Sequence, residues 1–175
     1  MDVYSRRIVG YKAADNMRAI NNVDALNMAI KLRGQNNYQN KLIHHSDRGS
    51  QYISDAYTEI LKNHGILISM CQNVLENAHI ERVNRTIKNQ YLQHRRINNF
   101  HQLVKWLDKT IYTYNYERPH SSILKMTPVE FENFVKELSD DSFCEKYKKE
   151  KPKFKIFTYQ QKDDKANFNQ LAFEF

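Results

Sequence analysis

The stretch that decides the fold is His44-His45-Ser46-Asp47-Arg48-Gly49-Ser50-Gln51-Tyr52. It begins in a short apolar run, and residues 41–45 predict a buried strand. A polar turn follows, and Ser54 is placed to cap a helix that stops at Gly65. Residues 66–70 predict another strand. Strand, helix and strand in this order indicate α/β organisation.

Upstream of this stretch, the pattern predicts two more strands and a helix. Residues 3–4 and 8–11 read as short strands joined by a polar turn, with β-branched residues in the second. A helix is expected from Asn21 or Asn22 to about Arg33, because apolar residues recur there at helical spacing. Gly34 would end that helix.

Downstream, helices dominate. Residues 77–93 and 100–116 both show helical periodicity, and Thr127 with Pro128 opens a short final helix with proline at its favoured first position. The fold class is therefore α/β, with a mixed sheet flanked by helices. We expect a core over residues 1–138 and a basic C-terminal tail over residues 139–175, where six lysines fall within residues 146–155.

Composition narrows the class of protein. The chain has 175 residues, a formal charge of +7 and 41% hydrophobic residues, which is typical of one globular domain. The positive charge leaves open a polyanionic partner or none. The sequence has no apolar run of roughly 18 residues and no secretory signal, so we expect no membrane span. Two cysteines without a CxxC spacing argue against structural zinc or a disulfide scaffold and fit a cytoplasmic protein.

Asp47 is the first candidate for chemistry. Alternate residues of a strand share a face, so Ile43, His45 and Asp47 are expected to point together. Asp47 also stands at the carboxyl end of the predicted strand, where open α/β sheets place their ligands, and Gly49 lets the backbone turn sharply there. The competing interpretation is that Asp47 only caps the turn or the next helix.

Glu81 is the second candidate. At 100° per residue, four residues of its helix form one buried stripe: Ile80, Val83, Ile87 and Tyr91. Glu81, Arg85 and Lys88 form a second stripe beside it. One interpretation is an ion pair between Glu81 and Arg85 on a solvated face. The other is a metal-ligating carboxylate, with Arg85 and Lys88 contacting phosphates.

Taken together, Asp47 and Glu81 suggest a metal site. Mg²⁺ prefers hard oxygen ligands and is usually held by one or two carboxylates plus phosphate oxygens. In two-metal phosphoryl transfer, one ion activates the attacking oxygen and the other stabilises the leaving oxygen. An aspartate at a strand end and a glutamate on a later helix are the parts that such a site requires.

Five motifs occur in order and carry a family resemblance. They are Tyr4-Ser5-Arg6-Arg7-Ile8-Val9-Gly10, His45-Ser46-Asp47-Arg48-Gly49-Ser50-Gln51-Tyr52, Glu76-Asn77-Ala78-His79-Ile80-Glu81, Tyr114-Asn115-Tyr116-Glu117-Arg118-Pro119-His120-Ser121-Ser122 and Thr127-Pro128-Val129-Glu130-Phe131. With them, the chain resembles the integrase-like subunit of bacterial insertion-sequence transposases, of the DDE group related to retroviral integrase. The resemblance covers about residues 2–131.

The resemblance implies a ribonuclease-H-like fold and an enzyme, dependent on Mg²⁺ or Mn²⁺, that cuts and rejoins DNA. It assigns Asp47 as the second catalytic carboxylate and Glu81 as the catalytic glutamate, both as metal ligands. Transposon ends and target DNA would be the partners. The DNA-binding residues that we expect beside these carboxylates are Arg85, Lys88, Arg82 and Arg48.

The chain departs from the family pattern at its start. The first catalytic aspartate of the family lies on a strand upstream of the segment that matches Asp2, and Asp2 itself matches a different aspartate. We therefore expect an N-terminally truncated core that lacks the first strand, with weak or no activity alone. The helix-turn-helix region of the family is also absent from this sequence.

Two further functions stay open. The chain could be a non-catalytic DNA-binding remnant, acting through mixed oligomers with a full-length transposase, or, less favoured, a hydrolase of RNA–DNA hybrids. We expect a homo-oligomer or such a mixed oligomer, in the bacterial cytoplasm near the nucleoid.

Other residues have competing interpretations. His44 and His45 point to opposite faces of a strand, so they cannot chelate one ion together and are expected to be packing residues. Trp106 could stack nucleotides or belong to the core. The same two interpretations apply to Tyr112, Tyr114 and Tyr116. Arg95, Arg96 and the tail lysines could contact phosphates or form a solvated face.

Overall fold

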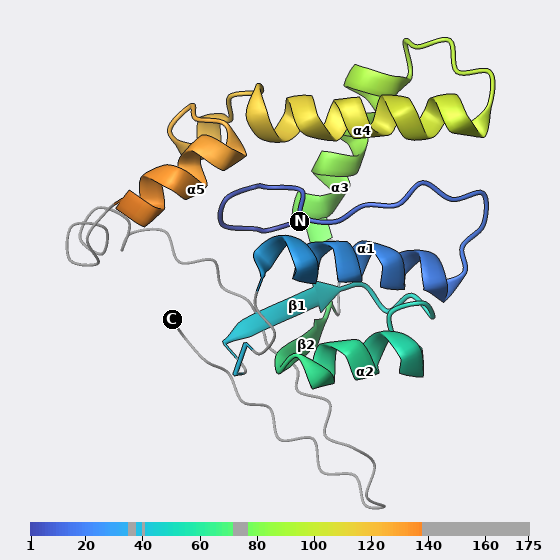
Figure 1. Cartoon of the computed structure of the whole chain (residues 1–175), viewed down its shortest axis with the longest axis vertical. Coiled ribbons are helices and arrows are strands. Elements are labelled where there is room, and N and C mark those ends of the chain that lie inside the picture. The colour runs from blue at the N-terminus through green and yellow to red at the C-terminus, as the bar shows by residue number, and fades with distance from the viewer. Residues whose placement is uncertain (35–37, 40, 72–76, 138–175) are drawn as a thin grey trace, which may run out of the picture. The chain divides into compact units, whose positions relative to one another are not determined.

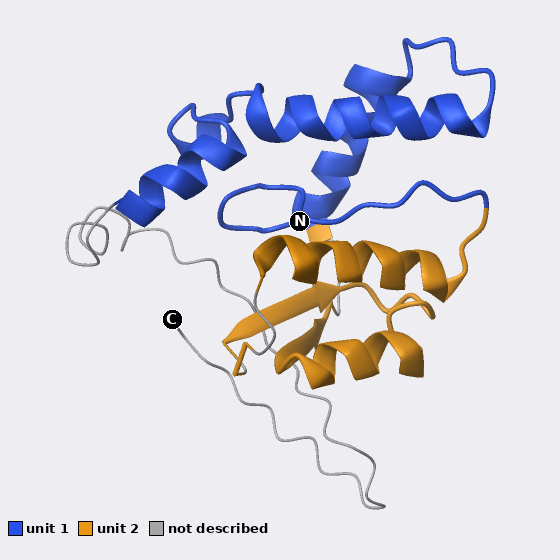
Figure 2. Ribbon diagram, in the orientation of Figure 1, with its two compact units in different colours: residues 1–15, 78–150 blue, residues 16–77, 151–175 orange. Residues whose placement is uncertain are grey.

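The computed structural model describes residues 1–34, 38–39, 41–71 and 77–137 (Figure 1). The chain divides into two compact units: unit 1 comprises residues 1–15 and 78–150, and unit 2 comprises residues 16–77 and 151–175 (Figure 2). The predicted tail, residues 139–175, lies outside the described residues, so its boundary stays a prediction. Within the described part of the chain, every helix is too short or too polar to cross a membrane.

Unit 2 contains the strands that the sequence predicts around Asp47. Its elements are α1 (Ala19–Arg33), β1 (Leu42–Ser46), α2 (Asp55–Asn63) and β2 (Ile66–Met70). The two strands are parallel, and α2 makes the connection between them. Their carboxyl ends therefore lie at the same sheet edge, and the Cys71 amide donates a further hydrogen bond to the Ser46 carbonyl at 2.9 Å.

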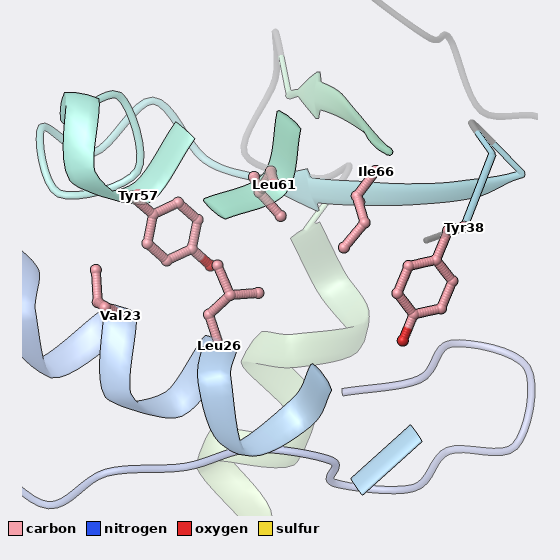
Figure 3. Packing of buried hydrophobic residues seen from close by; sticks show 6 residues of the cluster. All are labelled: Val23, Leu26, Tyr38, Tyr57, Leu61 and Ile66. Atoms are coloured by element: carbon pink, nitrogen blue, oxygen red, sulfur yellow. The ribbon is translucent and has the colours of Figure 1, made fainter. Parts of the chain in front are cut away.

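The core of unit 2 lies between its two helices and β2. Figure 3 shows the six buried side chains of this cluster: Val23, Leu26, Tyr38, Tyr57, Leu61 and Ile66. Leu61 of α2 is completely buried, with 0% of its surface exposed. Burial of this apolar surface, at roughly 25 cal/mol per Å², holds the helices on the sheet and so positions the turn that carries Asp47.

The prediction that the strand over residues 41–45 is buried is wrong for the strand observed there, β1. Leu42 is 41% exposed and Ile43 is 37% exposed. The physical reason is that β1 has one hydrogen-bonded neighbour, β2, in the described sheet. The buried strand residue of the core cluster is Ile66, which belongs to β2 and not to β1.

The start of α1 also differs from the prediction. The helix begins at Ala19 rather than at Asn21 or Asn22, and its N-cap residue, Arg18, makes no side-chain cap. Asn21 instead uses its side-chain amide to donate to the Asn16 carbonyl at 3.1 Å. The predicted end is confirmed, because Gly34 adopts a left-handed conformation (φ 63°) that glycine reaches without steric cost.

Unit 1 is mainly helical. It contains α3 (Ala78–Thr86), a π-helical segment η2 (Ile87–Leu92), α4 (Phe100–Tyr116), a 3₁₀ turn η3 (Ser121–Ile123) and α5 (Pro128–Glu137). Its buried core joins α3, η2 and α4 to the N-terminal segment through Ile8, Val83, Ile87, Ile111 and Tyr114.

The strands predicted over residues 3–4 and 8–11 do not form, and this prediction is wrong. Asp2 Oδ1 accepts hydrogen bonds from the amides of Tyr4 and Ser5 at 2.9 and 3.0 Å and so folds a turn. The backbone of Ile8 is hydrogen-bonded by the Asn115 side chain in place of a strand neighbour. The segment is therefore held by side chains of unit 1.

The later helix boundaries agree with the sequence. Asn99 caps α4 by accepting from the Gln102 amide at 2.9 Å. Before α5, Thr127 and Glu130 form a reciprocal capping box, with each backbone amide donating to the other side chain. These hydrogen bonds lower the pKa of the Glu130 carboxyl.

Candidate functional site

Asp47 follows β1 directly and is exposed at the carboxyl edge of the strand pair. Its Oδ1 accepts a hydrogen bond from the Gly49 amide at 2.9 Å, so the carboxylate does stabilise the turn, as the competing interpretation required. One carboxylate oxygen is enough for that hydrogen bond, which leaves the second oxygen able to accept another ligand.

Gly49 leaves space for the side chains around it, and its own backbone angle is ordinary. Gly49 is not among the glycines with positive φ. Its predicted role, which was to let the backbone turn sharply, is therefore not the role that it has. An added Cβ would lie 2.5 Å from Gln51 Nε2 and 3.0 Å from Asp47 Oδ1. A side chain at position 49 would therefore push directly on the candidate carboxylate.

The two histidines of β1 contact different neighbours, as their alternation predicts. His44 Nε2 lies 2.9 Å from the Tyr57 hydroxyl of α2, whereas His45 Nδ1 lies 3.0 Å from Ser69 Oγ of β2. Burial lowers the pKa of His44 to about 4, so this imidazole is neutral at physiological pH. Both histidines are therefore packing residues of the sheet.

A tyrosine pair supports the Asp47 turn from the side of α2. The rings of Tyr52 and Tyr57 pack edge to face at 5.4 Å between centroids. Burial raises the pKa of Tyr52, and the negative charge of Asp47 raises it further. The Tyr52 amide also donates to the Gly49 carbonyl at 2.9 Å, which closes the turn.

Glu81 lies in the first turn of α3, and its side chain is exposed. The predicted buried stripe of this helix is confirmed at Val83 and Ile87, which are buried, whereas Ile80 and Tyr91 at its two ends are half-buried. After Thr86 the helix widens into η2, where the Gln93 amide donates to the Lys88 carbonyl at 2.8 Å, five residues back. Such π-helical segments are frequent at functional sites.

The ion pair between Glu81 and Arg85, which one interpretation proposed, does not form among the described residues. Arg82 and Lys88 are exposed as well, and neither makes an ion pair within the described ranges. On unit 2, Arg48 is likewise exposed beside Asp47. The carboxylate of α3 and the cations of α3 and η2 thus all face solvent, where a ligand can reach them.

Further positive charge gathers at the start of α3. Arg6 Nη1 donates to His79 Nδ1 at 2.9 Å, and Arg6 adopts a left-handed backbone conformation (φ 64°) that is uncommon for this residue type. Burial lowers the pKa of His79, and the nearby charges of Arg6 and Arg82 lower it further. Sequence reasoning missed Arg6 and His79, although both lie within the quoted motifs.

The two candidate carboxylates belong to different units, Asp47 to unit 2 and Glu81 to unit 1. Their convergence on one ion therefore stays a prediction. Within the described ranges, no group of three or more His, Cys, Asp or Glu side chains is assembled for a metal ion. Asp2 is engaged in the Tyr4–Ser5 turn through its Oδ1.

Comparison with known proteins decides the family. Two family models, each described as an integrase core domain, match residues 1–74 and residues 68–128. This chain belongs to the integrase core domain family. It is similar to the "Insertion element IS600 uncharacterized 31 kDa protein" of Shigella sonnei, with 38% identity over 133 residues, 74% of this chain and 48% of that protein.

A second relative and a solved structure agree. The transposase for insertion sequence element IS904 of Lactococcus lactis is 31% identical over 139 residues, 77% of this chain and 53% of that protein. This integrase core chain thus spans about half the length of the curated relatives it matches. The magnesium complex of the HTLV-2 integrase catalytic core domain (trimeric form) has a TM-score of 0.57 at 20% identity, covering 75% of this chain and 80% of that one. The likeness confirms the predicted fold.

The remaining motifs of the integrase core hold unit 1 together. Arg7 forms an ion pair with Glu132 of α5 at 2.6 Å, and Ser5 Oγ donates to the same carboxylate at 2.7 Å. Asn115 fixes Ile8. The motifs around Ser5 and Asn115 therefore act as structural contacts between segments more than 100 residues apart.

The aromatic residues of α4 divide between core and surface. Tyr114 is buried, as the core interpretation expects. Tyr112 and Tyr116 are 55% and 45% exposed, and their rings stack at 4.8 Å with an interplanar angle of 17°, so the core interpretation is wrong for them. Trp106 is half-buried and lines a pocket.

Proposed function

We propose that this integrase core chain serves DNA transposition by metal-dependent phosphodiester cleavage and strand transfer. The family supports the reaction class, and the named relatives are insertion-sequence proteins. Because two of the family's three catalytic carboxylates, Asp47 and Glu81, are matched in this sequence, the activity of this chain alone is proposed to be weak. The proposed partners are transposon ends and target DNA, and the proposed location is the bacterial cytoplasm near the nucleoid.

The observation that carries the proposal is the placement of two exposed carboxylates on family motifs. Asp47 directly follows β1, and Glu81 occupies the first turn of α3. Glu81 makes no ion pair with the described residues, so its charge is not neutralised by Arg85.

The donor chemistry of these residues fits Mg²⁺ or Mn²⁺. Asp47 uses Oδ1 for the Gly49 amide and retains one oxygen for a ligand, while the Glu81 carboxylate retains both. Mg²⁺ is commonly held by one or two carboxylates and completes its shell with water and phosphate oxygens. When bound, such ions supply activation of the attacking oxygen and charge stabilisation of the leaving oxygen.

The cations beside the carboxylates would bind DNA. Arg82, Arg85 and Lys88 project from α3 and η2, and Arg48 follows Asp47. All four are exposed, and none is neutralised by an ion pair with the described residues. Lys and Arg side chains of this kind contact phosphate oxygens and release counterions, so DNA binding would weaken steeply with salt.

The test combines metal binding with chemistry on the full chain. Mn²⁺ binding, followed by electron paramagnetic resonance, should weaken at least about tenfold in Asp47→Asn and in Glu81→Gln, because each removes one charged ligand. Asp55→Asn and Glu117→Gln are matched controls, since both carboxylates are exposed and lie outside the proposed site. Mn²⁺ affinity unchanged by the two site substitutions would contradict the proposal.

Strand transfer on a DNA end substrate supplies the second readout. We expect weak product formation that requires Mg²⁺ or Mn²⁺ and is lost in Asp47→Asn, but not in Asp55→Asn. Robust turnover of the chain alone would contradict the proposed weakness. Turnover that survives both site substitutions would contradict the assignment of the carboxylates.

A second candidate function is DNA binding without catalysis. It is favoured by one observation: the described ranges assemble no group of three metal-ligating side chains, while several cations are exposed. The chain would then act in oligomers of itself or with a full-length transposase. Salt-dependent DNA binding that is unchanged by Asp47→Asn, together with absent cleavage, would support this function. Absence of DNA binding at low salt would exclude it.

A further inference from the structure

Unit 1 carries a pocket that the proposed metal site does not use. It lies between the end of η2 and one face of α4, and its volume is about 110 Å³. Six residues line it: Tyr91, Arg95, Trp106, Lys109, Thr110 and Thr113. This volume is below the roughly 150 Å³ of a cavity that encloses a single aromatic ring, so the open pocket has room for part of one nucleotide and not for a large ligand.

Two cations are held over the tryptophan of this pocket. The Arg95 guanidinium carbon lies 4.3 Å from the centroid of the Trp106 ring, and Lys109 Nζ lies 5.5 Å from it. A cation–π interaction positions a charge without cancelling it, in contrast to an ion pair. Neither cation is paired with a carboxylate within the part of the chain that the structure describes. The pocket therefore presents two ordered positive charges to an anion.

The second aromatic wall is also fixed in place. Arg118 Nη1 donates to the Tyr91 hydroxyl at 3.4 Å and to Gln90 Oε1 at 2.5 Å, and its guanidinium lies over the Tyr91 ring at 5.9 Å. Thr110 and Thr113 complete the lining on the α4 side. Aromatic rings and cations together match the base and the phosphate of a nucleotide.

The surface around the pocket selects for a polyanion. Residues 88–109 contain five Lys and Arg and a single acidic residue, Asp108. All five cations are exposed: Lys88, Arg95, Arg96, Lys105 and Lys109. Such a surface repels basic partners and attracts a phosphate backbone. The aromatic walls favour an unpaired strand, because a base must be free of its duplex to stack on them.

We propose that this pocket binds an unpaired nucleotide of a DNA strand. Arg95 and Lys109 would take the phosphate, and the base would lie against Trp106 and Tyr91. Arg95 already lies over the Trp106 ring, and it can stay there when a base binds, because guanidinium planes also stack on bases. The site lies on unit 1 alone and involves neither Asp47 nor Glu81, so it extends the proposed function without depending on the metal.

Trp106 makes this proposal directly measurable, because it is the single tryptophan of the chain. Titration of the full chain with an oligodeoxythymidine should quench the fluorescence of Trp106, and the matched duplex should quench it far less. In the double variant Arg95→Gln/Lys109→Gln, affinity for the oligodeoxythymidine should fall roughly tenfold or more. The slope of log affinity against log salt should also fall by about 0.7, because the variant no longer neutralises the one phosphate that the two cations would contact.

The matched control is Arg96→Gln/Lys105→Gln, which removes two exposed cations that do not line the pocket. We expect a smaller loss of affinity in this variant and unchanged quenching at saturation. Equal losses in both double variants would overturn the proposal, since binding would then follow overall charge. Absence of quenching, or equal quenching by duplex, would overturn it as well.

One further variant separates this inference from the proposed metal site. Glu81→Gln should retain the full quenching by oligodeoxythymidine while it loses Mn²⁺ binding. Trp106→Phe, followed by fluorescence anisotropy of a labelled oligodeoxythymidine, should bind more tightly than Trp106→Ala, because phenylalanine keeps a stacking surface. Equal affinity of these two variants would exclude stacking.

Discussion

The side chain of Asn115 pairs with both backbone groups of Ile8. The Ile8 amide donates to Asn115 Oδ1 at 2.9 Å, and Asn115 Nδ2 donates to the Ile8 carbonyl at 2.9 Å. Both residues are buried. The amide side chain thus satisfies the backbone N–H and C=O of Ile8, as a neighbouring strand would in a sheet, because it offers one acceptor and one donor side by side.

Replacement of Asn115 by alanine should destabilise the chain by about 2–4 kcal/mol, since it leaves a buried amide and a buried carbonyl without partners. Urea unfolding followed by circular dichroism measures the change. Asn84→Ala is the control, because Asn84 is exposed on α3 of the same unit. A loss below about 0.5 kcal/mol would contradict the bridging role of Asn115.

The ion pair between Arg7 and Glu132 should also be important for stability. Its side chains are 15% and 11% exposed, so Glu132→Ala leaves a largely buried guanidinium without its carboxylate. We expect a loss of roughly 3 kcal/mol. The double variant Arg7→Ala/Glu132→Ala should lose less than the sum of the two single variants, and simple additivity would show that the pair is not coupled.

His44 should make stability depend on pH in the acidic range. Burial lowers its folded pKa to about 4, so below the ordinary value near 6.5 the unfolded chain binds a proton that the folded chain refuses. The free energy of unfolding should therefore fall as pH drops from 6.5 to 4, by about 3 kcal/mol from this residue.

The measurement for His44 is chemical unfolding at several pH values in wild type and in His44→Leu/Tyr57→Phe. The difference between the two slopes isolates His44, and removal of the Tyr57 hydroxyl avoids leaving it buried without its partner. His101→Gln serves as an exposed control. Identical pH slopes in wild type and double variant would contradict a buried neutral imidazole.

Gly49→Ala should affect the proposed metal site more than stability. The added Cβ would meet the flexible end of Gln51 and the Asp47 carboxylate rather than backbone. We expect a stability loss below about 1 kcal/mol together with weaker Mn²⁺ binding. Gln51→Ala in the same chain removes the closest obstruction and should partly restore Mn²⁺ binding. A large stability loss with unchanged Mn²⁺ binding would show that Gly49 serves the fold alone.

Arg85→Gln and Lys88→Gln should each lower the salt dependence of duplex DNA binding. The slope of log affinity against log salt should fall by about 0.9 for each phosphate that is no longer neutralised. Lys62→Gln is the control, since Lys62 is exposed on α2. A slope that is unchanged in both variants would remove these two residues from the DNA-binding surface.

The sequence predicted the elements whose signals are local. The period of apolar residues located α2, β2 and α4, and Gly34 marked the end of α1, because capping needs only residues within one turn. The buried stripe through Val83 and Ile87 followed from 100° per residue. The five motifs, in their order, were enough to indicate the family.

The structure overturned predictions that depend on distant partners. The β-branched residues at positions 8–11 fit a strand, yet the backbone of Ile8 is bound by a side chain 107 positions away. Leu42 and Ile43 fit a buried strand, yet burial depends on what covers the strand. Trp106 could have been core or surface, and only the positions of Arg95 and Lys109 decided that it lines a cationic pocket.

The sequence by itself determined the order of the main helices and strands after residue 18, the family, and the two carboxylates placed on family motifs, because periodicity, caps and motifs depend on neighbouring residues. Only the tertiary structure decided that Asn115 holds the N-terminal segment at Ile8. It also decided that Glu81 has no ion-pair partner among the described residues, and that a pocket opens beside Trp106. Those outcomes depend on which distant side chains satisfy a buried backbone group or stand beside a charge. No local pattern specifies that choice.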